Sequence, residues 1–294
     1  MPDRPIVDVV IVAYRSGATL RGCVEPLLAL PHVRVTVVDN ASPDDTLDAI
    51  AGLPVELIRS ERNGGFSYGC NLGARAGDAP YLLFLNPDAR LEPSALDTLL
   101  AALEAHPGAG VAGPRIIEPG GALSFSRRRF PRQRSTFAQA LFLHRLRPLA
   151  PWTDELVRDP AAYEQAGEAE WISGACMLMR REAFAAIGGF DEDFFLYCED
   201  TDICRRLWDG GWSVRFEAGA EVHHVGGASS GAGETQAIAA RSRIVYAEKH
   251  LGRRGALVQR LGVALGELTH AVASLTRPAS RRGHLAALRA VLPS

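Results

Sequence analysis

A regular alternation of apolar runs and helical patterns fills the first 115 residues and restricts the folds open to this chain. The apolar runs contain almost no polar alternation, so each reads as a strand buried on both faces. They lie at Val7–Tyr14, Val33–Asn40, Val55–Ser60, Tyr81–Asn86 and Gly110–Ile116, with helical spacing between them at Ala18–Leu30 and Ser94–Glu104. Buried strands that alternate with helices are typical of a mainly parallel sheet covered by helices. The sequence therefore predicts an α/β fold.

Two of the predicted strands end in acidic residues. Asp39 lies at the end of one strand, and Asp88 follows Asn86 and a proline after another. Ligands of such sheets gather where the carboxyl ends of the strands open into loops. At this edge Asp39 suits the base or ribose of a nucleotide, and Asp88 suits a hard cation that also binds diphosphate oxygens. For both, a turn role is the plain alternative. After Asp39, Ser42 predicts the N-cap of a helix.

A second acidic cluster follows the aromatic run FFLYC. Glu199, Asp200 and Asp202 stand at the start of a predicted helix. Carboxylates crowded beside apolar walls raise one another's pKa, as a general base requires. The alternative is a solvated acidic first turn that the helix dipole favours, with a surface ion pair to Arg205 or Arg206.

Adjacent histidines, His223 and His224, end a predicted strand and should point to opposite faces of the sheet. The glycines of Gly64–Gly69 do not form a dinucleotide fingerprint, because they follow the third strand and their spacing is wrong. The sequence also has no GxxxxGK[ST], GxSxG or HExxH motif. Hydride transfer, P-loop hydrolysis and serine hydrolysis therefore have no support.

Charge is distributed unevenly along a chain whose net charge is only −2. The segment from Arg241 onward contains ten Lys or Arg against two Glu, which leaves the rest of the chain acidic. The near-zero total argues against nucleic-acid binding, whereas the basic tail suits an anionic membrane surface or a homodimer contact. Five scattered cysteines indicate reduced thiols in the cytoplasm. No signal peptide or membrane-spanning run is expected.

Taken together, these motifs resemble family 2 glycosyltransferases, which are inverting enzymes of the GT-A fold, and within them the bacterial rhamnosyltransferase-like branch. The resemblance covers about Val7 to Ser230. The motifs that carry it are VVIVAYRSGATLRGCVEPLL, VVDNASPDDT, RNGGFSYGCNLGARAG, LLFLNPDA, SGACMLMRREAF, GGFDEDFFLYCEDTDICRRL and VHHVGGAS. The resemblance implies a catalytic domain at residues 1–232, with a nucleotide-sugar-binding half (1–116) and an acceptor half (117–232). A basic helical extension would follow at 233–294.

The resemblance also assigns roles to individual positions. Asp200 would be the general base, with Glu199 beside it. Asp88 and His224 would bind Mg²⁺ or Mn²⁺, although Asn86 stands where the first acid of the family's metal-binding motif often stands. The residues expected to contact the nucleotide-sugar donor are Asp39, Ala13, Tyr14, Asn63, Asn71 and Asn86.

By the same resemblance, the donor would be dTDP-rhamnose and the acceptor a glycan, or a glycan on a polyprenyl diphosphate, in cell-envelope polysaccharide synthesis. The enzyme would sit at the inner face of the cell membrane. The alternatives are a UDP-sugar donor (UDP-galactofuranose or UDP-N-acetylglucosamine) and a nucleotide-sugar-binding protein without activity. A sugar-phosphate nucleotidyltransferase is disfavoured, because the loop after the first strand offers only Arg15 to a triphosphate.

Overall fold

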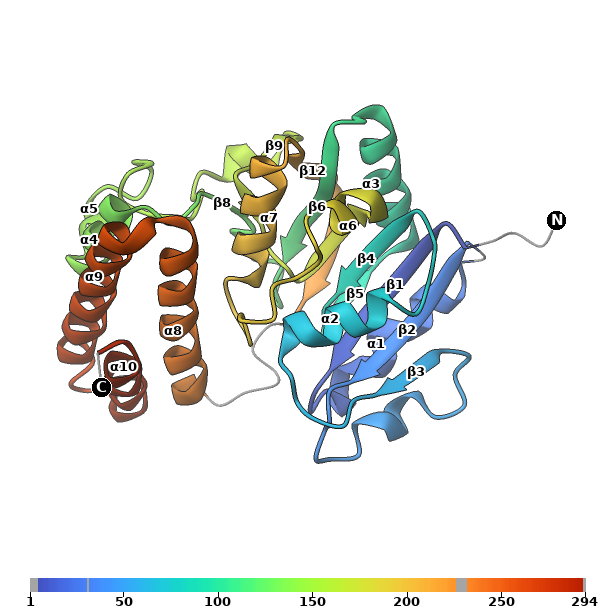
Figure 1. The fold of residues 1–294 in the computed structure, drawn as a ribbon, viewed down its shortest axis with the longest axis horizontal. Coiled ribbons are helices and arrows are strands. Elements are labelled where there is room, and N and C mark those ends of the chain that lie inside the picture. Colours follow the sequence, from blue (N-terminus) through green and yellow to red (C-terminus); the bar gives the residue numbers. More distant parts are fainter. Residues whose placement is uncertain (1–4, 31, 226–231, 293–294) are drawn as a thin grey trace. The chain divides into compact units, whose positions relative to one another are not determined.

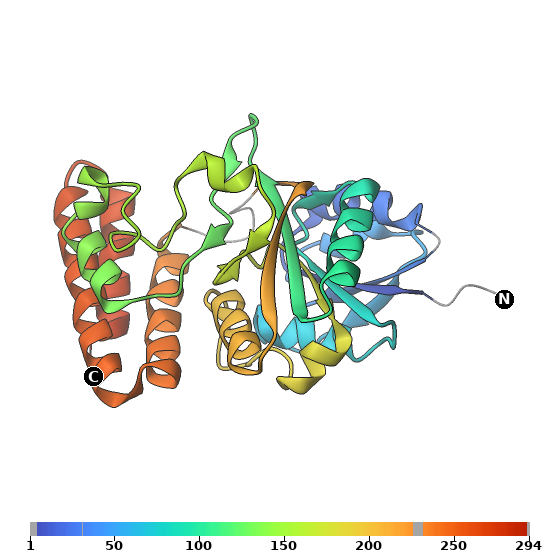
Figure 2. The same ribbon diagram turned by 90° about the horizontal axis from the view of Figure 1, so that it is seen from above.

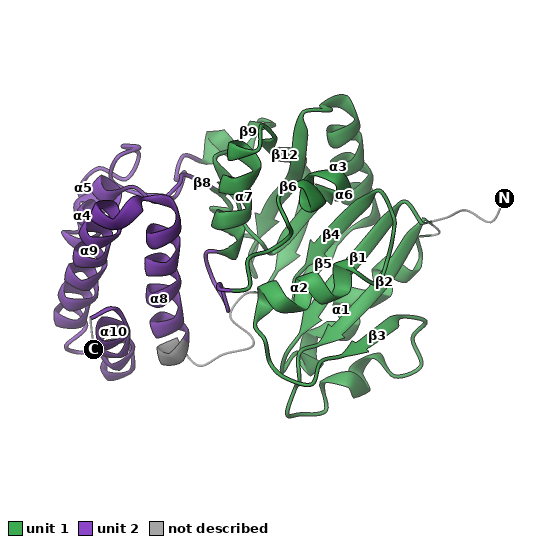
Figure 3. Cartoon of the chain, in the orientation of Figure 1, with its two compact units in different colours: residues 1–127, 160–192, 199–229 green, residues 128–159, 193–198, 230–294 purple. Residues whose placement is uncertain are grey.

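The computed structural model describes residues 5–30, 32–225 and 232–292. The chain divides into two compact units (Figure 3). Unit 1 comprises residues 1–127, 160–192 and 199–229, and unit 2 comprises residues 128–159, 193–198 and 230–294. The domain limits expected at residues 116 and 232 stay a prediction.

The centre of unit 1 is a ten-stranded mixed sheet with the order β3-β2-β1-β4-β11-β6-β12-β5, to which β7 and β9 are added at β6 and β12. Its strands are β1 (Val7–Ala13), β2 (Val33–Asp39), β3 (Glu56–Arg59), β4 (Tyr81–Leu85), β5 (Ala89–Leu91), β6 (Ala109–Ile117), β7 (Leu123–Ser124), β9 (Gly167–Glu168), β11 (Cys176–Arg180) and β12 (Ser213–His224). The first four strands of that order are mutually parallel, whereas β11 and β5 run antiparallel to their neighbours. All five predicted strands are confirmed. Two further strands, β8 (Arg127–Arg128) and β10 (Trp171–Ile172), are short.

Helices cover both faces of this sheet (Figures 1 and 2). One face carries α1 (Gly17–Leu28) and α3 (Pro93–Ala105), whose leucines share a core with the odd-numbered residues of β1. The other face carries α2 (Phe66–Ala74), α6 (Arg181–Ala186) and α7 (Glu199–Asp209). Two 3₁₀ helices, η1 (Thr46–Ile50) and η2 (Pro160–Tyr163), complete the unit.

The glycines of α2 let this helix lie directly on β1. A Cβ atom on Gly69 would lie 2.6 Å from Val12, and one on Gly73 would lie 2.3 Å from Val10. Glycine therefore serves helix–strand packing in this segment, which agrees with the rejection of a dinucleotide fingerprint.

The expected helix after Ser42 is shorter and begins later than predicted. The structure has the 3₁₀ helix η1 there, with Asp45 at the N-cap position and no side-chain capping bond. The Ser42 hydroxyl instead accepts a hydrogen bond from the backbone N–H of Arg15 at 3.3 Å. The Ser42 hydroxyl, which the local sequence pattern predicts as a helix N-cap, thus takes part in a tertiary hydrogen bond instead.

Unit 2 is helical. It contains α4 (Gln133–Ala140), α5 (Leu143–Leu146), α8 (Ala232–His250), α9 (Gly252–Ala273) and α10 (Pro278–Val291). Side chains of α8, α9 and α10 form a small core that includes Ile244, Val263 and Val291. The guanidinium of Arg243 on α8 pairs with the buried Glu155 in the segment after α5. None of the described helices combines the length and the apolar character that crossing a bilayer requires.

Candidate active site

Three neighbouring strands of unit 1 open at one edge of the sheet. The register pairs Ala13 of β1 with Asp39 of β2, and β4 lies on the other side of β1 and ends at Leu85. Because β11 runs antiparallel to β4 with Cys176 opposite Leu85, the residues just before β11 reach the same edge. Asp39 and Asp88 therefore follow strands that lie two strand spacings apart, about 10 Å. The expectation that both acids lie at one edge is confirmed.

Asp39, the last residue of β2, is hydrogen-bonded to the loop that follows the strand. Its side chain is buried, and its Oδ1 accepts a hydrogen bond from the backbone N–H of Ser42 at 3.0 Å. Across the loop, Arg15 adopts a positive φ of 51° just after Ala13 and Tyr14. The chain thus leaves the extended conformation directly after β1, opposite the Asp39 end of β2.

The next residue, Asn40, ties this loop to the segment before α2. Its Nδ2 donates to Asn63 Oδ1 at 2.9 Å and to Gly65 O at 3.0 Å, and its Oδ1 accepts from the N–H of Gly64 at 3.1 Å. Asn63 Oδ1 also accepts from the N–H of Gly65 at 3.1 Å. Sequence reasoning missed Asn40. Its place directly after a strand-end aspartate was the available signal.

Asp88 and His224 meet at the end of β4. Asp88 Oδ1 lies 3.1 Å from His224 Nε2, and Asn86 Nδ2 lies 3.2 Å from the same nitrogen. The β5–β12 ladder pairs Ala89 with His224, and the N–H of Val225 donates to Asp88 O at 3.1 Å. A residue pair separated by 136 positions is thus held together by backbone hydrogen bonds on both sides.

The two histidines point to opposite faces, as expected. The His223 side chain is 56% exposed and lies 3.6 Å from Glu221, whereas the His224 side chain is 20% exposed and turns to Asp88. His224 is therefore the histidine at the site.

This pair has the separation that two adjacent metal ligands need. Ligands at about 2.1 Å from a cation and at right angles lie about 3.0 Å apart, close to the 3.1 Å between Asp88 Oδ1 and His224 Nε2. Across the described residues, no cluster of three or more His, Cys, Asp or Glu has metal-binding geometry. Asp88 and His224 could therefore act as two ligands of a divalent cation.

Asp200 is connected to this site through the residues before β11. The Asn86 N–H donates to Ala175 O at 3.0 Å, and the N–H of the preceding residue, Gly174, donates to Asp200 Oδ2 at 3.0 Å. The other carboxylate oxygen, Oδ1, accepts from the N–H of Thr201 at 2.7 Å. Two backbone N–H groups thus fix the orientation of the carboxylate.

Gly174 is a second residue that sequence reasoning missed. A Cβ atom at this position would lie 3.2 Å from Asp200 Cβ. Glycine is therefore needed for the backbone to approach the carboxylate this closely. The pair of small residues in SGAC was the only signal.

Glu199 lies beside Asp200 and is buried. Its Oε2 has no hydrogen-bond partner within the described residues. Burial raises the pKa of Glu199 well above the ordinary value of 4.5, and the charge of Asp200 raises the pKa further. The environment thus favours the neutral form of Glu199.

The third acid of this cluster, Asp202, has a structural partner. Its carboxylate is fully buried and accepts a hydrogen bond from Arg206 Nε at 2.7 Å. Arg206 also donates to the carbonyls of Ile187 and Gly189. The pair with Arg206 considered above exists, but it is buried and is not part of a solvated acidic turn.

Asn71 on α2 is hydrogen-bonded to the loop after α6. Its amide donates to Phe190 O and to Glu192 Oε1, both at 2.9 Å, and accepts from the N–H of Phe190 at 3.0 Å. The side chain thus fixes the loop after α6, and its expected donor contact stays a prediction.

Comparison with protein families gives two matches. The model described as "Glycosyl transferase family 2" matches residues 8–188, and the model described as "N-terminal domain of galactosyltransferase" matches residues 160–225. The first match covers more than half of the chain and includes both strand-end acids.

Two curated relatives are rhamnosyltransferases. The N-acetylglucosaminyl-diphospho-decaprenol L-rhamnosyltransferase of Mycobacterium tuberculosis is 34% identical over 265 residues, which covers 84% of this chain and 86% of the relative. The rhamnosyltransferase WbbL of Escherichia coli is 30% identical over 152 residues, 51% of each chain. Among solved structures, the mannosyltransferase PcManGT of Pyrobaculum calidifontis, in complex with GDP-Man and Mn²⁺, superposes with a TM-score of 0.60 at 15% identity. That match covers 99% of this chain and 88% of the other. It supports the GT-A fold.

Proposed function

Because this chain belongs to glycosyl transferase family 2 and is a glycosyltransferase, we propose that it transfers rhamnose from dTDP-rhamnose to a lipid-linked glycan. The acceptor would be a saccharide on a polyprenyl diphosphate in cell-envelope polysaccharide synthesis. Two of its relatives are rhamnosyltransferases, and the name of one specifies an N-acetylglucosaminyl-diphospho-decaprenol acceptor.

The observation that carries this proposal is that Asp88 and Asp200 are connected through the residues before β11 but have different surroundings. Asp88 is paired with His224, a metal-binding side chain, whereas Asp200 is held by two backbone N–H groups and lies beside the buried Glu199. A protein that only binds a nucleotide sugar has no use for the second acid. An inverting transferase needs both.

In the proposed reaction, Asp200 acts as the general base. The acceptor hydroxyl attacks the anomeric carbon from the face opposite the diphosphate, and Asp200 takes the hydroxyl proton as the new C–O bond forms. The bond between the anomeric carbon and the diphosphate oxygen breaks, and its electron pair leaves with dTDP. Base catalysis of this type contributes about 10²–10⁴-fold. Burial raises the pKa of Glu199, so this side chain favours its neutral form beside the proposed base.

Asp88 and His224 would hold Mg²⁺ or Mn²⁺ together with diphosphate oxygens. When bound, the cation would offset the negative charge that develops on the leaving dTDP. Asp39 would accept a hydrogen bond from the nucleoside, and Ala13 and Tyr14 at the end of β1 would contact the donor beside it. Asn63 and Asn86 would complete the donor pocket, and Asn71 would support it through the loop after α6.

A donor panel tests the proposal. The protein is mixed with Mn²⁺ or Mg²⁺ and with dTDP-rhamnose, UDP-galactofuranose or UDP-N-acetylglucosamine, with and without a polyprenyl-diphosphate-linked N-acetylglucosamine, and nucleoside diphosphate is measured. We expect release of dTDP, stimulation by the acceptor and loss of activity with EDTA. Release of UDP alone would show that the donor assignment is wrong. Undiminished transfer in EDTA would refute the metal assignment.

A further inference from the structure

One face of α9 in unit 2 is apolar and exposed. Its side chains are spaced by three, four or seven residues, so they lie on one side of the helix and the turn after it. This α9 face consists of Leu257, Leu261, Leu268, Val272 and Leu275, each between 48% and 60% exposed. Exposed apolar side chains that gather on one side of a helix are typical of an interaction surface.

The remaining sides of α9 are covered by unit 2 itself. Val263 packs in the core with α8 and α10. Gly262 and Gly266 face α4, where Cβ atoms would lie 3.0 Å from Thr136 and 3.6 Å from Ala140. The α9 face is therefore not a part of this core that happens to be solvent-accessible.

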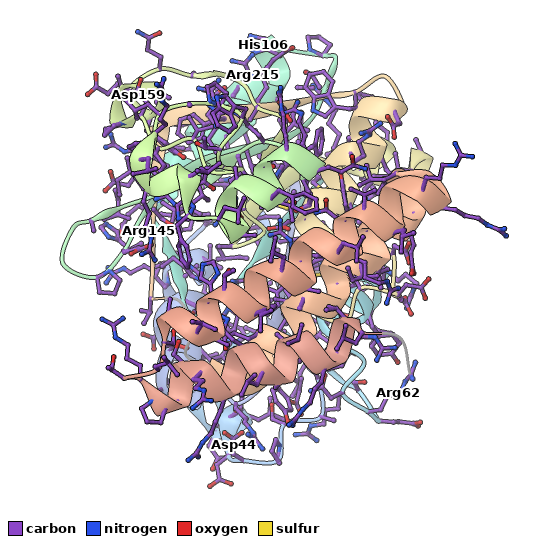
Figure 4. The ribbon with its side chains drawn as sticks, turned by 90° about the vertical axis from the view of Figure 1, so that its left-hand side faces the viewer. Asp44, Arg62, His106, Arg145, Asp159 and Arg215 are labelled. Atoms are coloured by element: carbon purple, nitrogen blue, oxygen red, sulfur yellow. The ribbon has the colours of Figure 1, made fainter. Side chains whose placement is uncertain are left out.

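A second group of exposed apolar side chains lies beside α9, on a different side of the helix from the α9 face, because His270 is two residues from Leu268 and from Val272. Phe142 stacks on His270 of α9 at 4.5 Å, and the guanidinium of Arg145, which Figure 4 labels, lies 4.4 Å from the Phe142 ring centre. Four apolar residues near Phe142 in the sequence are exposed, and Leu146 reaches 78%. They are Leu141, Leu146, Leu149 and Trp152.

The charges around the α9 face are positive. Arg253 and Arg254 precede it, and Arg277, Arg281 and Arg282 follow it, all exposed. The single acid between residues 252 and 292 is Glu267, whose Oε2 lies 2.8 Å from His284 Nδ1 on α10. The acid is thus engaged within the unit, and both ends of the face present arginine.

This charge pattern distinguishes between two binding partners for the α9 face, a second copy of the chain and a phospholipid surface. In a symmetric pair of α9 helices, parallel or antiparallel, arginine clusters would meet arginine clusters. An anionic phospholipid surface complements the same pattern, because leucines enter the boundary between headgroups and acyl chains while arginines contact the phosphates. We infer that the α9 face docks on an anionic phospholipid bilayer. This inference does not depend on the donor, the metal or the base.

Vesicle flotation of the full chain tests the inference. We expect binding to vesicles of phosphatidylcholine mixed with phosphatidylglycerol, little binding to phosphatidylcholine alone, and release by salt. The double variant Leu261→Gln/Leu268→Gln should lose about tenfold or more in affinity for each leucine. Arg253→Gln/Arg254→Gln should lose on the order of fivefold for each arginine.

Matched controls come from unit 1. Leu57→Gln changes a leucine that is 38% exposed, and Arg59→Gln/Arg75→Gln removes two exposed arginines; neither should change flotation. Thermal melting checks that the leucine variant folds, and the arginine variant tests the inference on its own if it does not. Donor turnover without lipid should stay unchanged in both the leucine variant and the arginine variant of unit 2.

Three results would overturn the inference. The first is equal flotation with both kinds of vesicle, and the second is unchanged flotation in the folded α9 variants. The third is a wild-type dimer in sedimentation velocity that the leucine variant dissolves while no vesicle binds, because the face would then be a contact between two copies of the chain.

Discussion

Replacing Asp200 with asparagine should separate catalysis from folding in this chain. The two carboxylate oxygens accept from different backbone donors, Gly174 N–H at 3.0 Å and Thr201 N–H at 2.7 Å. An asparagine side chain has only one acceptor oxygen, so its NH₂ group must face one of these N–H groups. Leaving a partly buried donor unsatisfied costs about 1–3 kcal/mol of stability.

The catalytic loss should be larger. Removal of a general base lowers the rate by about 10²–10⁴-fold, which corresponds to about 2.7–5.4 kcal/mol in the barrier at 1.36 kcal/mol for each factor of ten. We therefore expect Asp200→Asn to melt somewhat earlier, to bind dTDP-rhamnose nearly as tightly, and to lose almost all nucleoside diphosphate release.

Asp202→Asn is the matched control, because it makes the same change two residues along α7. Asp202 is fully buried against Arg206, and breaking such a pair costs about 3–5 kcal/mol. This variant should therefore be less stable than Asp200→Asn, and its folded fraction should keep kcat. Calorimetry, donor titration and initial rates on both proteins decide the matter. Near wild-type transfer by Asp200→Asn, or an equal loss of kcat in a folded Asp202→Asn, would refute the assignment of Asp200 as base.

Three further variants probe the remaining contacts. His224→Gln should raise the Mn²⁺ concentration for half-maximal rate by at least about tenfold, whereas the exposed His223→Gln should not; equal responses would contradict the ligand assignment. Glu199 has a raised pKa, so the folded chain loses stability as pH rises above the ordinary carboxyl value of 4.5, when only the unfolded chain ionises freely. The melting temperature of Glu199→Gln should therefore rise relative to that of wild type as pH increases from about 5 to about 8. A difference in melting temperature that stays constant over this range would contradict the raised pKa of Glu199. Gly174→Ala would place a Cβ atom 3.2 Å from Asp200 Cβ and should lower kcat more than stability. Gly167→Ala, whose added Cβ atom would have its nearest neighbour at 3.6 Å, should change neither kcat nor stability. Activity equal to wild type in Gly174→Ala would exclude the positioning role.

Periodicity predicted the strands and the acids at their ends, because both are local properties of the sequence. Strand direction is not local. The run at Cys176–Arg180 is as apolar as the parallel strands, yet it pairs antiparallel with β4. Its direction depends on where the chain returns to the sheet, which no short pattern records. The contact between Asp88 and His224 was expected from the family resemblance, whereas its cause is the pairing of β5 with β12.

Residues that act through the backbone were the hardest to find. Asn40 uses its amide to hold the turn before α2, and Gly174 serves by having no side chain. Ser42 was assigned a cap because its local sequence fits one, but its hydroxyl accepts from Arg15 across the loop. In each case a tertiary partner decides the role, and the partner lies far away in the sequence.

One short segment, Gly174 and Ala175, connects the two acidic regions of the site. Ala175 O accepts the Asn86 N–H, and the Gly174 N–H binds the Asp200 carboxylate, so the chain that leads into β11 touches both acidic regions within two residues. Because β11 is then hydrogen-bonded between β4 and β6, this segment rests on a central strand of the sheet. Any displacement of it would shift Asp200 relative to the Asp88–His224 pair. The antiparallel direction of β11, which the sequence does not reveal, is thus the feature that brings the proposed base and the proposed metal ligands to one edge.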